Sequence, residues 1–387
     1  ILALSTWLRY LDLFGIAVPF PPNAYQGDYV KEMAAQIKEA HGDRFAKVAA
    51  ADVLAGAPGV EADKEGHLDA LIANAKNLLG SDYAWVHGFA LTEQLGDGRE
   101  DLEEFGVTFD KWFSERSLYV KDTEGETAGT SAVDRAFEKL DKMGYLYTKD
   151  GALWFRSTDL GDDKDRVLIK SDGEYTYFAS DVAYHWDKFQ RVDHVIDIWG
   201  ADHHGYIERV RCVCDALGYP GKFEVLLGQL VNLLRNGKPV RMSKRKGTMV
   251  TLQELVDEVG SDAARYTLIS KSSNQMVDFD IEAVKEKSQN NPVYYVQYAH
   301  ARICSLLAQW NGDAEAIAAL AHADLALLDN PHELAIAAKL AEFPELINAA
   351  AAELAPHLIA FYLKDLAALF HSYYNAERMI VENQALS

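Results

Sequence analysis

The chain has 387 residues, of which 49% are apolar and 25% are charged, so it can bury a large core and we expect two or three domains. Its 38 basic and 59 acidic residues give a formal net charge of −21, which argues against indiscriminate polyanion binding but allows a nucleic-acid partner that meets a local basic patch. Three cysteines are too few for a disulfide framework and no window approaches a membrane-spanning apolar run, so we expect a cytoplasmic protein with neither a membrane span nor a secretory signal.

The first 144 residues have a mainly helical pattern. In chain order it predicts helices over residues 1–14, 25–79 (broken near 56–59) and 132–143, a solvated acidic helix face over 93–104, and short strands over 107–109 and 117–120. The first residue is Ile1 and not Met, and the pattern of the last residues, 381–387, indicates no helix cap at the end of the chain. We therefore expect that the chain was cut from something longer.

Residues 145–228 indicate a hairpin-like excursion followed by alternating strands and helices. The pattern predicts the excursion over 145–170, strands over 174–178, 195–199 and 223–227, and helices over 180–189 and 206–217. This is half of a doubly wound parallel, Rossmann-type α/β sheet, which binds ligands at the carboxyl ends of its strands. A capping box at Thr251 to Glu254 opens another helix, and beyond Pro292 the sequence indicates an all-helical domain.

The densest positive charge lies between Arg235 and Thr248, a segment with six basic residues and no acid. Gly237, Pro239 and Gly247 favour a loop there. Mobile lysines after a parallel strand suit the neutralisation of a triphosphate during phosphoryl or nucleotidyl transfer. The alternative is a solvated hairpin tip.

The segment Arg241-Met242-Ser243-Lys244 resembles the KMSK signature of class I aminoacyl-tRNA synthetases, with Arg in the first place. Together with residues 105–115, 197–206 and 291–302, it makes nearly the whole chain similar to bacterial-type arginyl-tRNA synthetase. The resemblance implies a ligase that forms arginyl-adenylate from arginine and ATP, with Mg²⁺ accompanying the ATP, and passes the arginyl group to tRNA. We also expect a monomer.

The resemblance places Tyr177 and Asp181, a Tyr-x-x-x-Asp element, in the arginine pocket. We expect Asp181 in the first turn of a helix, where the helix dipole keeps its carboxylate ionised to take a guanidinium bidentately. Tyr177, leaving the preceding strand, would orient that carboxylate or stack on the guanidinium. Without the resemblance, the preferred interpretation of Asp181 is an acidic residue at the start of a helix with no role in ligand binding.

Two adjacent histidines, His203 and His204, follow the strand over 195–199, where neutral imidazoles can donate to a ligand or to adenosine. The alternative for each histidine is a purely structural role with no ligand contact. We assign His204 to the arginine pocket, and assign ATP binding to Gly200, Asp202, His203, Met242, Ser243 and Lys244. The catalytic candidates are Lys244 and Lys246, which would stabilise the departing pyrophosphate.

A zinc site built from Cys212 and Cys214 with the neighbouring histidines is the weaker interpretation of that cysteine pair. One short pair without a second cluster favours buried thiols on a helix. We therefore expect no metal site.

Class I synthetases also carry a His-x-Gly-His element, and this sequence has none; residues 202–205 have the wrong order and His87-Gly88 stands alone. In the family this element lies upstream of the region where Ile1 begins, so we expect a fragment, and its activity alone is left open. Two alternatives remain. One is another class I synthetase, such as the cysteine enzyme, which would want thiolate metal ligands instead of Asp181. The other is a non-catalytic tRNA-binding or scaffold protein of the same fold.

The resemblance divides the chain into residues 1–170, part of a catalytic domain with an inserted α+β region, residues 171–288, its second half, and residues 289–387, a helical anticodon-binding domain. The tRNA-binding candidates on that last domain are Tyr295, Tyr298 and Arg302. Aromatic and basic side chains of this kind bind unpaired bases. The three share one helical face, so helix packing is the alternative.

Overall fold

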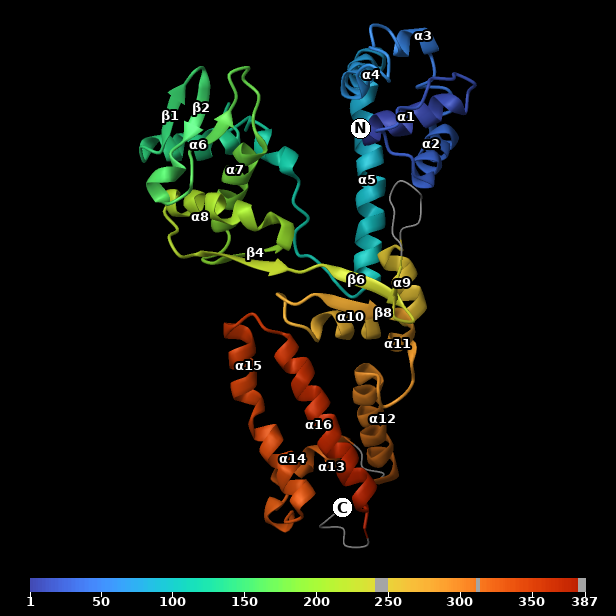
Figure 1. The fold of residues 1–387 in the computed structure, drawn as a ribbon, viewed down its shortest axis with the longest axis vertical. Helices are drawn as coiled ribbons and strands as arrows, with labels where there is room; N and C mark the ends of the chain where they lie inside the picture. The colour runs from blue at the N-terminus through green and yellow to red at the C-terminus, as the bar shows by residue number, and fades with distance from the viewer. Residues whose placement is uncertain (241–249, 311–313, 382–387) are drawn as a thin grey trace. The chain divides into compact units, whose positions relative to one another are not determined.

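The computed structural model describes residues 1–240, 250–310 and 314–381. Contacts divide these residues into two compact units (Figure 1). The first unit comprises residues 1–108 with 250–257, and the second comprises residues 109–240 with 258–381. None of the described helices is both long enough and apolar enough to cross a membrane.

The first unit is built from helices, as its pattern predicted. They are α1 (Leu2–Asp12), α2 (Asp28–His41), α3 (Ala50–Val53), α4 (Lys64–Leu79) and α5 (Ser81–Glu104). The aromatic side chains of α1 lie in its core, where Trp7 Nε1 donates to the Phe45 carbonyl at 2.9 Å and Tyr10 Oη donates to the Gly42 carbonyl at 2.6 Å. The predicted acidic helix face falls on the second half of α5.

The second unit begins with an α+β region and continues with a parallel strand pair. Its elements up to residue 228 are η1 (Glu115–Tyr119), α6 (Ala132–Lys142), β1 (Leu146–Lys149), β2 (Ala152–Phe155), η2 (Ser157–Leu160), β3 (Arg166–Ile169), α7 (Tyr177–Phe189), β4 (Val195–Gly200), η3 (Ala201–Tyr206), α8 (Ile207–Ala216) and β5 (Phe223–Gly228). Strands β1, β2 and β3 form an antiparallel sheet, which confirms the hairpin-like excursion.

The predicted strand–helix–strand unit is present as β4, α8 and β5. Strands β4 and β5 pair in parallel, from Val195 opposite Phe223 to Gly200 opposite Gly228. Side chains of α7 and α8 pack with those of β4 and β5 in buried apolar clusters. The parallel pairing confirms the expected α/β class and places the ends of both strands, where such folds bind ligands, next to each other.

A second sheet, which the sequence pattern did not predict, includes the first residues of the basic segment, where only a loop was expected. It contains β6 (Val231–Arg235), β7 (Lys238–Pro239) and β8 (Val277–Asp280), with β6 parallel to β8 and antiparallel to β7. The helices that follow are α9 (Leu252–Val259), α10 (Ser261–Ile269) and α11 (Ile281–Lys285). The capping box that opens α9 is confirmed, since Thr251 N donates to Glu254 Oε2 at 2.8 Å and Glu254 N donates to Thr251 Oγ1 at 3.1 Å.

From residue 292 onward the described chain is helical, as predicted. The elements are α12 (Pro292–Trp310), α13 (Ala314–Ala319), η5 (Leu320–His322), η6 (Leu325–Leu327), α14 (Pro331–Ala341), α15 (Phe343–Ala352) and α16 (His357–Ala376). Helix α16 contacts α12, α14 and α15 (Figure 1). A hydrogen bond of 3.0 Å from Tyr266 Oη on α10 to the Ala360 carbonyl ties α16 to the preceding segment.

Three predicted strands are wrong. Residues 107–109 form no strand, and residues 115–119 form the 3₁₀ helix η1. In place of the strand over 174–178 there is a single bridge at Tyr175, and α7 already begins at Tyr177. The helix begins early because Thr176, its N-cap residue, is fixed to β3 by a 2.9 Å bond from Oγ1 to the Val167 carbonyl.

Candidate active site

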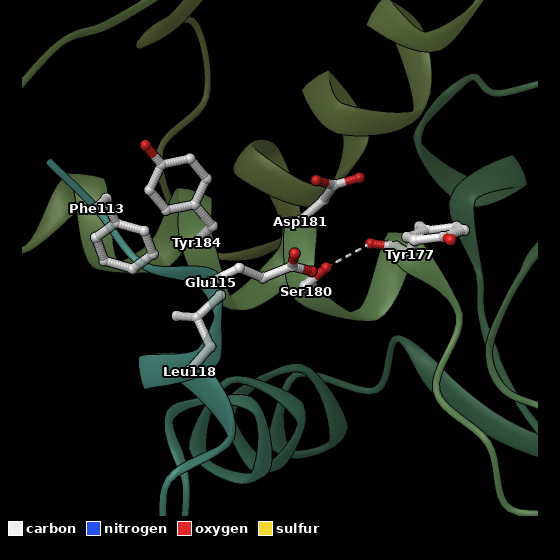
Figure 2. Close-up of a pocket in the computed structure, with 7 residues that line it drawn as sticks. All are labelled: Phe113, Glu115, Leu118, Tyr177, Ser180, Asp181 and Tyr184. Atoms are coloured by element: carbon white, nitrogen blue, oxygen red, sulfur yellow. Dashed lines mark hydrogen bonds between the residues drawn. The ribbon is translucent and has the colours of Figure 1, made fainter. Parts of the chain in front are cut away.

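A cavity of about 320 Å³ lies between η1 and the exposed face of α7 (Figure 2). Its lining residues are Phe113, Glu115, Leu118, Tyr177, Ser180, Asp181 and Tyr184. Figure 2 shows the Glu115 side chain reaching from η1 toward Ser180 on α7. The cavity therefore combines two carboxylates with aromatic and aliphatic walls.

A larger cavity of about 860 Å³ shares Tyr177, Asp181 and Tyr184 with the first. It extends along β4 to Gly200 and also touches His203. Cavities of this size are typical of small-molecule sites, and this one lies where a parallel strand ends, the usual ligand position in α/β folds. One face of α7 thus borders both a small and a large binding space.

Asp181 sits at the junction of the two cavities, but not in the first turn of its helix. Because α7 begins at Tyr177, Asp181 is the fifth residue of the helix, and no acid lies in the first turn. The argument from the helix dipole is therefore wrong for this residue. Instead, Tyr206 at the end of η3 donates its hydroxyl to Asp181 Oδ2 at 2.5 Å.

Tyr206 stays protonated as the donor in that contact. Burial, followed by the hydrogen bond to Asp181, raises the pKa of Tyr206 well above its ordinary value. The Tyr206 ring also packs edge-on to Phe178 on α7, with ring centres 6.3 Å apart. The position of the Asp181 carboxylate is thus set by η3 as well as by its own helix.

Tyr177 projects from the first turn of α7 and is 89% exposed. Tyr177 is a lining residue of both cavities, and its carbonyl accepts a 2.8 Å hydrogen bond from Ser180 Oγ (Figure 2). Tyr177 and Asp181 are four residues apart on one helix, so their side chains share a face. The predicted Tyr-x-x-x-Asp pair is therefore brought together at one site.

The histidine turn after β4 divides between the cavity and solvent. All four residues are exposed, but Gly200 and His203 line the larger cavity, whereas Asp202 and His204 are not among its lining residues. His203 Nε2 lies 3.8 Å from Asp202 Oδ2. Of the residues assigned to ATP in this turn, Gly200 and His203 have the clearest place in the cavity wall.

Residues 107–310 match the family described as "tRNA synthetases class I (R), catalytic domain", and residues 296–386 match the "DALR anticodon binding domain". The first match covers more than half of the chain. The chain belongs to the arginyl-tRNA synthetase family.

Relatives in the family support this assignment over the full chain. An arginine–tRNA ligase of Aromatoleum aromaticum is 58% identical over 398 residues, covering 100% of this chain and 66% of the relative. An arginine–tRNA ligase of Acinetobacter baylyi is 46% identical and also covers 100% of this chain and 66% of the relative. The chain therefore spans somewhat less than two thirds of the length of these relatives.

Solved structures of the family share the fold. A Campylobacter jejuni protein described as an arginyl-tRNA synthetase is 29% identical with a TM-score of 0.76, covering 100% of this chain and 76% of that one. The Thermus thermophilus arginyl-tRNA synthetase is 18% identical with a TM-score of 0.67, covering 99% and 68%. The second likeness concerns the fold alone.

The KMSK-like residues of the family assignment lie outside the described residues. This applies to Met242, Ser243, Lys244 and Lys246. Of the basic residues in that segment, the structure describes Arg235 and Lys238, and the Arg235 guanidinium is paired with Glu258 at 2.7 Å and Glu282 at 2.5 Å. The hydrogen bonds from Arg235 and Lys285 lower the pKa of Glu258 to about 2. Arg235 thus anchors the beginning of the segment instead of offering a free charge.

The three tRNA candidates of the helical region lie on α12 facing α16. Arg302 Nη1 lies 3.0 Å from His371 Nδ1, and the guanidinium covers the rings of Tyr298 and Tyr374 at 4.5 and 4.4 Å. The carbonyl of Tyr295 contacts His371 Nε2 at 3.1 Å. Tyr298 is 40% exposed. Helix packing therefore engages all three, with Tyr298 the most accessible aromatic ring.

The cysteines of α8 are buried thiols, as expected for a packed helix. Burial raises the pKa of Cys212 to about 11. Over residues 1–240, 250–310 and 314–381, no three His, Cys, Asp or Glu side chains gather as metal ligands.

Sequence reasoning missed several residues that line the two cavities. They are Phe109, Phe113, Glu115, Tyr184, His185, Lys188, Asp197 and Tyr206. Glu115, Asp197 and Tyr206 stand at the ends or beginnings of segments that carried the family resemblance. The sequence signal for these three residues was an acid or a tyrosine within a segment that resembles the family. The sequence did not show which residues they would contact in the folded protein.

Proposed function

We propose that the chain provides the arginine-binding and part of the ATP-binding machinery of an arginine–tRNA ligase. In the first step, the arginine carboxylate attacks the α-phosphate of ATP, giving arginyl-adenylate and pyrophosphate. In the second step, a hydroxyl of the terminal ribose of tRNA takes the arginyl group and releases AMP. The family and the 58% identity to an arginine–tRNA ligase support this proposal.

The observation that carries the arginine assignment is the pair of carboxylates in the smaller cavity. Asp181 and Glu115 line the same space as the aromatic residues Tyr177, Tyr184 and Phe113. A guanidinium has five donors in a plane and pairs with carboxylates bidentately, while its flat faces and aliphatic stem prefer aromatic walls. The cavity therefore suits an arginine side chain better than a lysine side chain.

The larger cavity is the proposed nucleotide space. Gly200 lets the backbone approach a ligand closely, and His203 can donate a hydrogen bond without adding permanent charge. We keep Asp202 and His204 as weaker candidates, for ATP and for arginine respectively. Lys244, with Lys246, would stabilise the leaving pyrophosphate, and Met242 and Ser243 would contact ATP. Mg²⁺ would arrive with ATP.

The proposed roles of the domains follow the domain boundaries predicted from the sequence. Residues 1–170 and 171–288 would serve catalysis, and residues 289–387 would contact tRNA through the face that holds Tyr295, Tyr298 and Arg302. We also propose a monomer that acts in the cytoplasm.

The proposal is tested by replacing Asp181 with Asn in the full-length enzyme. A buried guanidinium that loses its counter-charge costs roughly 3 kcal/mol or more, so use of arginine should fall about a hundredfold while the KM for ATP changes little. Glu115→Gln should act in the same direction. Asp193→Asn, an exposed acid beyond α7, is the matched control.

The readout is arginine-dependent exchange of pyrophosphate into ATP, measured with tRNA present and against a panel of amino acids. Exchange with cysteine or another amino acid in preference to arginine would favour a different class I synthetase. No exchange with any amino acid, together with tRNA binding, would favour the non-catalytic alternative. An unchanged KM for arginine and an unchanged kcat in Asp181→Asn would contradict the assignment of this residue.

A further inference from the structure

A largely buried polar cluster joins α7 to β4 and contributes to the wall of the larger cavity. Oδ2 of Asp197 lies 2.9 Å from His185 Nε2, and its Oδ1 accepts a hydrogen bond of 2.6 Å from Lys188 Nζ. The His185 and Asp197 side chains are 3% and 9% exposed. Charged and polar groups buried to this degree are costly unless every donor meets an acceptor.

The second ring nitrogen of His185 also faces an acceptor. His185 Nδ1 lies 2.7 Å from the carbonyl oxygen of Asp181. A carbonyl oxygen can only accept, so Nδ1 must carry a proton. Each of the two ring nitrogens therefore faces an oxygen atom, one of a carbonyl group and one of a carboxyl group.

The Asp197 carboxyl group is ionised and can only accept. Burial acts to raise the pKa of Asp197, but the hydrogen bonds from His185 and Lys188 outweigh burial and leave the pKa below its ordinary value. The geometry alone gives the same requirement, since Oδ1 accepts from the Lys188 ammonium and Oδ2 faces His185 Nε2, so Nε2 must also carry a proton if the carboxylate is to accept there. With protons on both nitrogens, the ring is an imidazolium.

The other groups around the His185 ring add no charge to the cluster at neutral pH. On β5, Phe223 meets the His185 ring edge-on at 5.3 Å, and on α7 the Tyr184 ring is 6.0 Å away. Burial, and then Asp197, raise the pKa of Tyr184 and of the Cys214 thiol on α8, so both groups are neutral. The charge of the cluster thus comes from His185, Lys188 and Asp197.

The geometry points to His185 as a positioning residue, held as an imidazolium between the Asp197 carboxylate and the Asp181 carbonyl, that fixes the arginine-binding face of α7 against β4. Its contacts connect the two proposed subsites, because Asp181 lies one helical turn before His185 while Asp197 lies three residues before Gly200. A neutral side chain at 185 leaves one buried acceptor without a donor, and α7 is then free to shift. Only the part of this inference that concerns arginine binding rests on the proposed function.

The protonation state is tested by NMR on the full chain labelled with ¹³C and ¹⁵N in histidine, at pH 7.5. The signal that disappears in His185→Gln identifies the residue. We expect the pattern of two protonated ring nitrogens for His185, and the pattern of a single protonated nitrogen in Asp197→Asn, where an amide replaces the carboxylate. A neutral ring in the unmodified protein at this pH overturns the inference.

The positioning role is tested by calorimetric titration with arginine. We expect His185→Gln to weaken arginine binding about tenfold. Because His185 also lines the larger cavity, ATP binding is titrated in parallel, and a loss of ATP binding as large as the loss of arginine binding would overturn a role in positioning the arginine-binding face. The double variant His185→Gln/Asp197→Asn, which pairs two neutral amides, should recover part of the loss, whereas a general loss of structure would not be rescued. Circular dichroism establishes that each variant is folded.

The outcomes separate the two proposals. If the unmodified protein binds no arginine, the proposed function fails and the positioning role fails with it, while the NMR result still decides the protonation state. If the unmodified protein binds arginine and a folded His185→Gln binds it equally well, the positioning role alone is overturned.

Discussion

Tyr206 Oη donates a hydrogen bond to Asp181 Oδ2 at 2.5 Å, joining the last residue of η3 to the second turn of α7. The contact fixes one oxygen of the carboxylate, and Oδ1, which forms no hydrogen bond with the residues that the structure describes, could accept from a ligand. Because burial and Asp181 both raise the pKa of Tyr206, the phenol remains a donor throughout the pH range in which the enzyme would work. A turn expected to contact ATP thus also orients the acid expected to bind arginine.

The first prediction concerns this contact. Tyr206→Phe keeps the ring and removes the donor, and a hydrogen bond to a charged group contributes about 1.5–3 kcal/mol, so the KM for arginine should rise at least roughly tenfold. Steady-state exchange kinetics measure the change. Tyr147→Phe is a matched control, because Tyr147 also donates to an acid, Asp165, at 3.0 Å, but lies in β1.

An unchanged KM for arginine in Tyr206→Phe would show that Asp181 does not depend on this donor. An equal effect of Tyr147→Phe would mean that the loss reflects general stability instead of the site.

The second prediction concerns an ion pair in the α+β region. Arg166 holds Asp162 with two contacts, Nε to Oδ2 at 2.8 Å and Nη2 to Oδ1 at 2.6 Å, and the two side chains are 12% and 3% exposed. Hydrogen bonds from Arg166 hold the pKa of Asp162 well below its ordinary value, although burial alone would raise it. The folded protein therefore binds fewer protons here than the unfolded chain does.

This difference in proton binding sets the direction of the pH effect. The stabilisation by Asp162 is complete above the unfolded pKa of about 3.9 and is lost as the pH falls below that value toward the folded pKa. At pH 7, Asp162→Asn should lower the free energy of unfolding by up to about 3 kcal/mol, because it leaves a largely buried guanidinium with only the exposed carboxylate of Asp163 as a charged partner.

Urea unfolding at pH 7 and at pH 3 checks this prediction, with Asp163→Asn as control, since Asp163 contacts the same guanidinium but is 73% exposed. We expect the difference between Asp162→Asn and the unmodified protein to shrink at pH 3. A difference that stays constant between the two pH values would argue against the ion pair as its source.

The third prediction concerns the KMSK-like segment. Lys244→Ala should lower the rate of adenylate formation and leave arginine affinity nearly intact, because a contact to the departing pyrophosphate strengthens only as charge develops on the phosphates. Pre-steady-state formation of adenylate measures the rate, and Lys238→Ala on β7 is a nearby control. A parallel loss of arginine binding would count against the assignment of Lys244.

Hydrophobic periodicity was enough to predict the helices and the parallel pair of β4 and β5. It misplaced the beginning of α7 because the residues from Tyr175 to Phe178 are aromatic or β-branched and favour strands locally. A tertiary contact overrides that preference, since the hydroxyl of Thr176, the N-cap residue of α7, donates to the Val167 carbonyl on β3. Local propensity cannot report such a contact.

The candidate site divides in the same way. Tyr177 and Asp181 could be predicted because a single helix places both, four residues apart, on one face. Glu115 and Tyr206 could not, because they come from η1 and η3, and only the packing of these elements on α7 brings them to the same carboxylate or cavity. Likewise, the buried environment of His185 follows from the pairing of α7 with β4.

The last prediction separates two roles on the proposed tRNA face of α12. Tyr298 is 40% exposed and can stack on a base, while Arg302 lies over its ring at 4.5 Å and also contacts His371 on α16. Because the guanidinium already has these neighbours, Arg302 should act by holding Tyr298 in place, not by neutralising a phosphate. Base stacking on an aromatic ring contributes about 1–3 kcal/mol, so Tyr298→Ala should weaken tRNA binding roughly tenfold or more.

Salt dependence distinguishes the roles of these two residues. Each phosphate contact adds about 0.7–0.9 to the slope of log affinity against log salt, so a residue that neutralises a phosphate lowers that slope when it is removed. We expect Tyr298→Ala and Arg302→Ala to weaken tRNA binding with the slope unchanged, as measured by filter binding between 50 and 200 mM salt with both variants folded by circular dichroism. With a net charge of −21, the chain should show a shallow slope throughout, since few of its surfaces can attract phosphates. A slope reduced by about one unit in Arg302→Ala would show instead that the guanidinium leaves its aromatic neighbours to meet the RNA backbone.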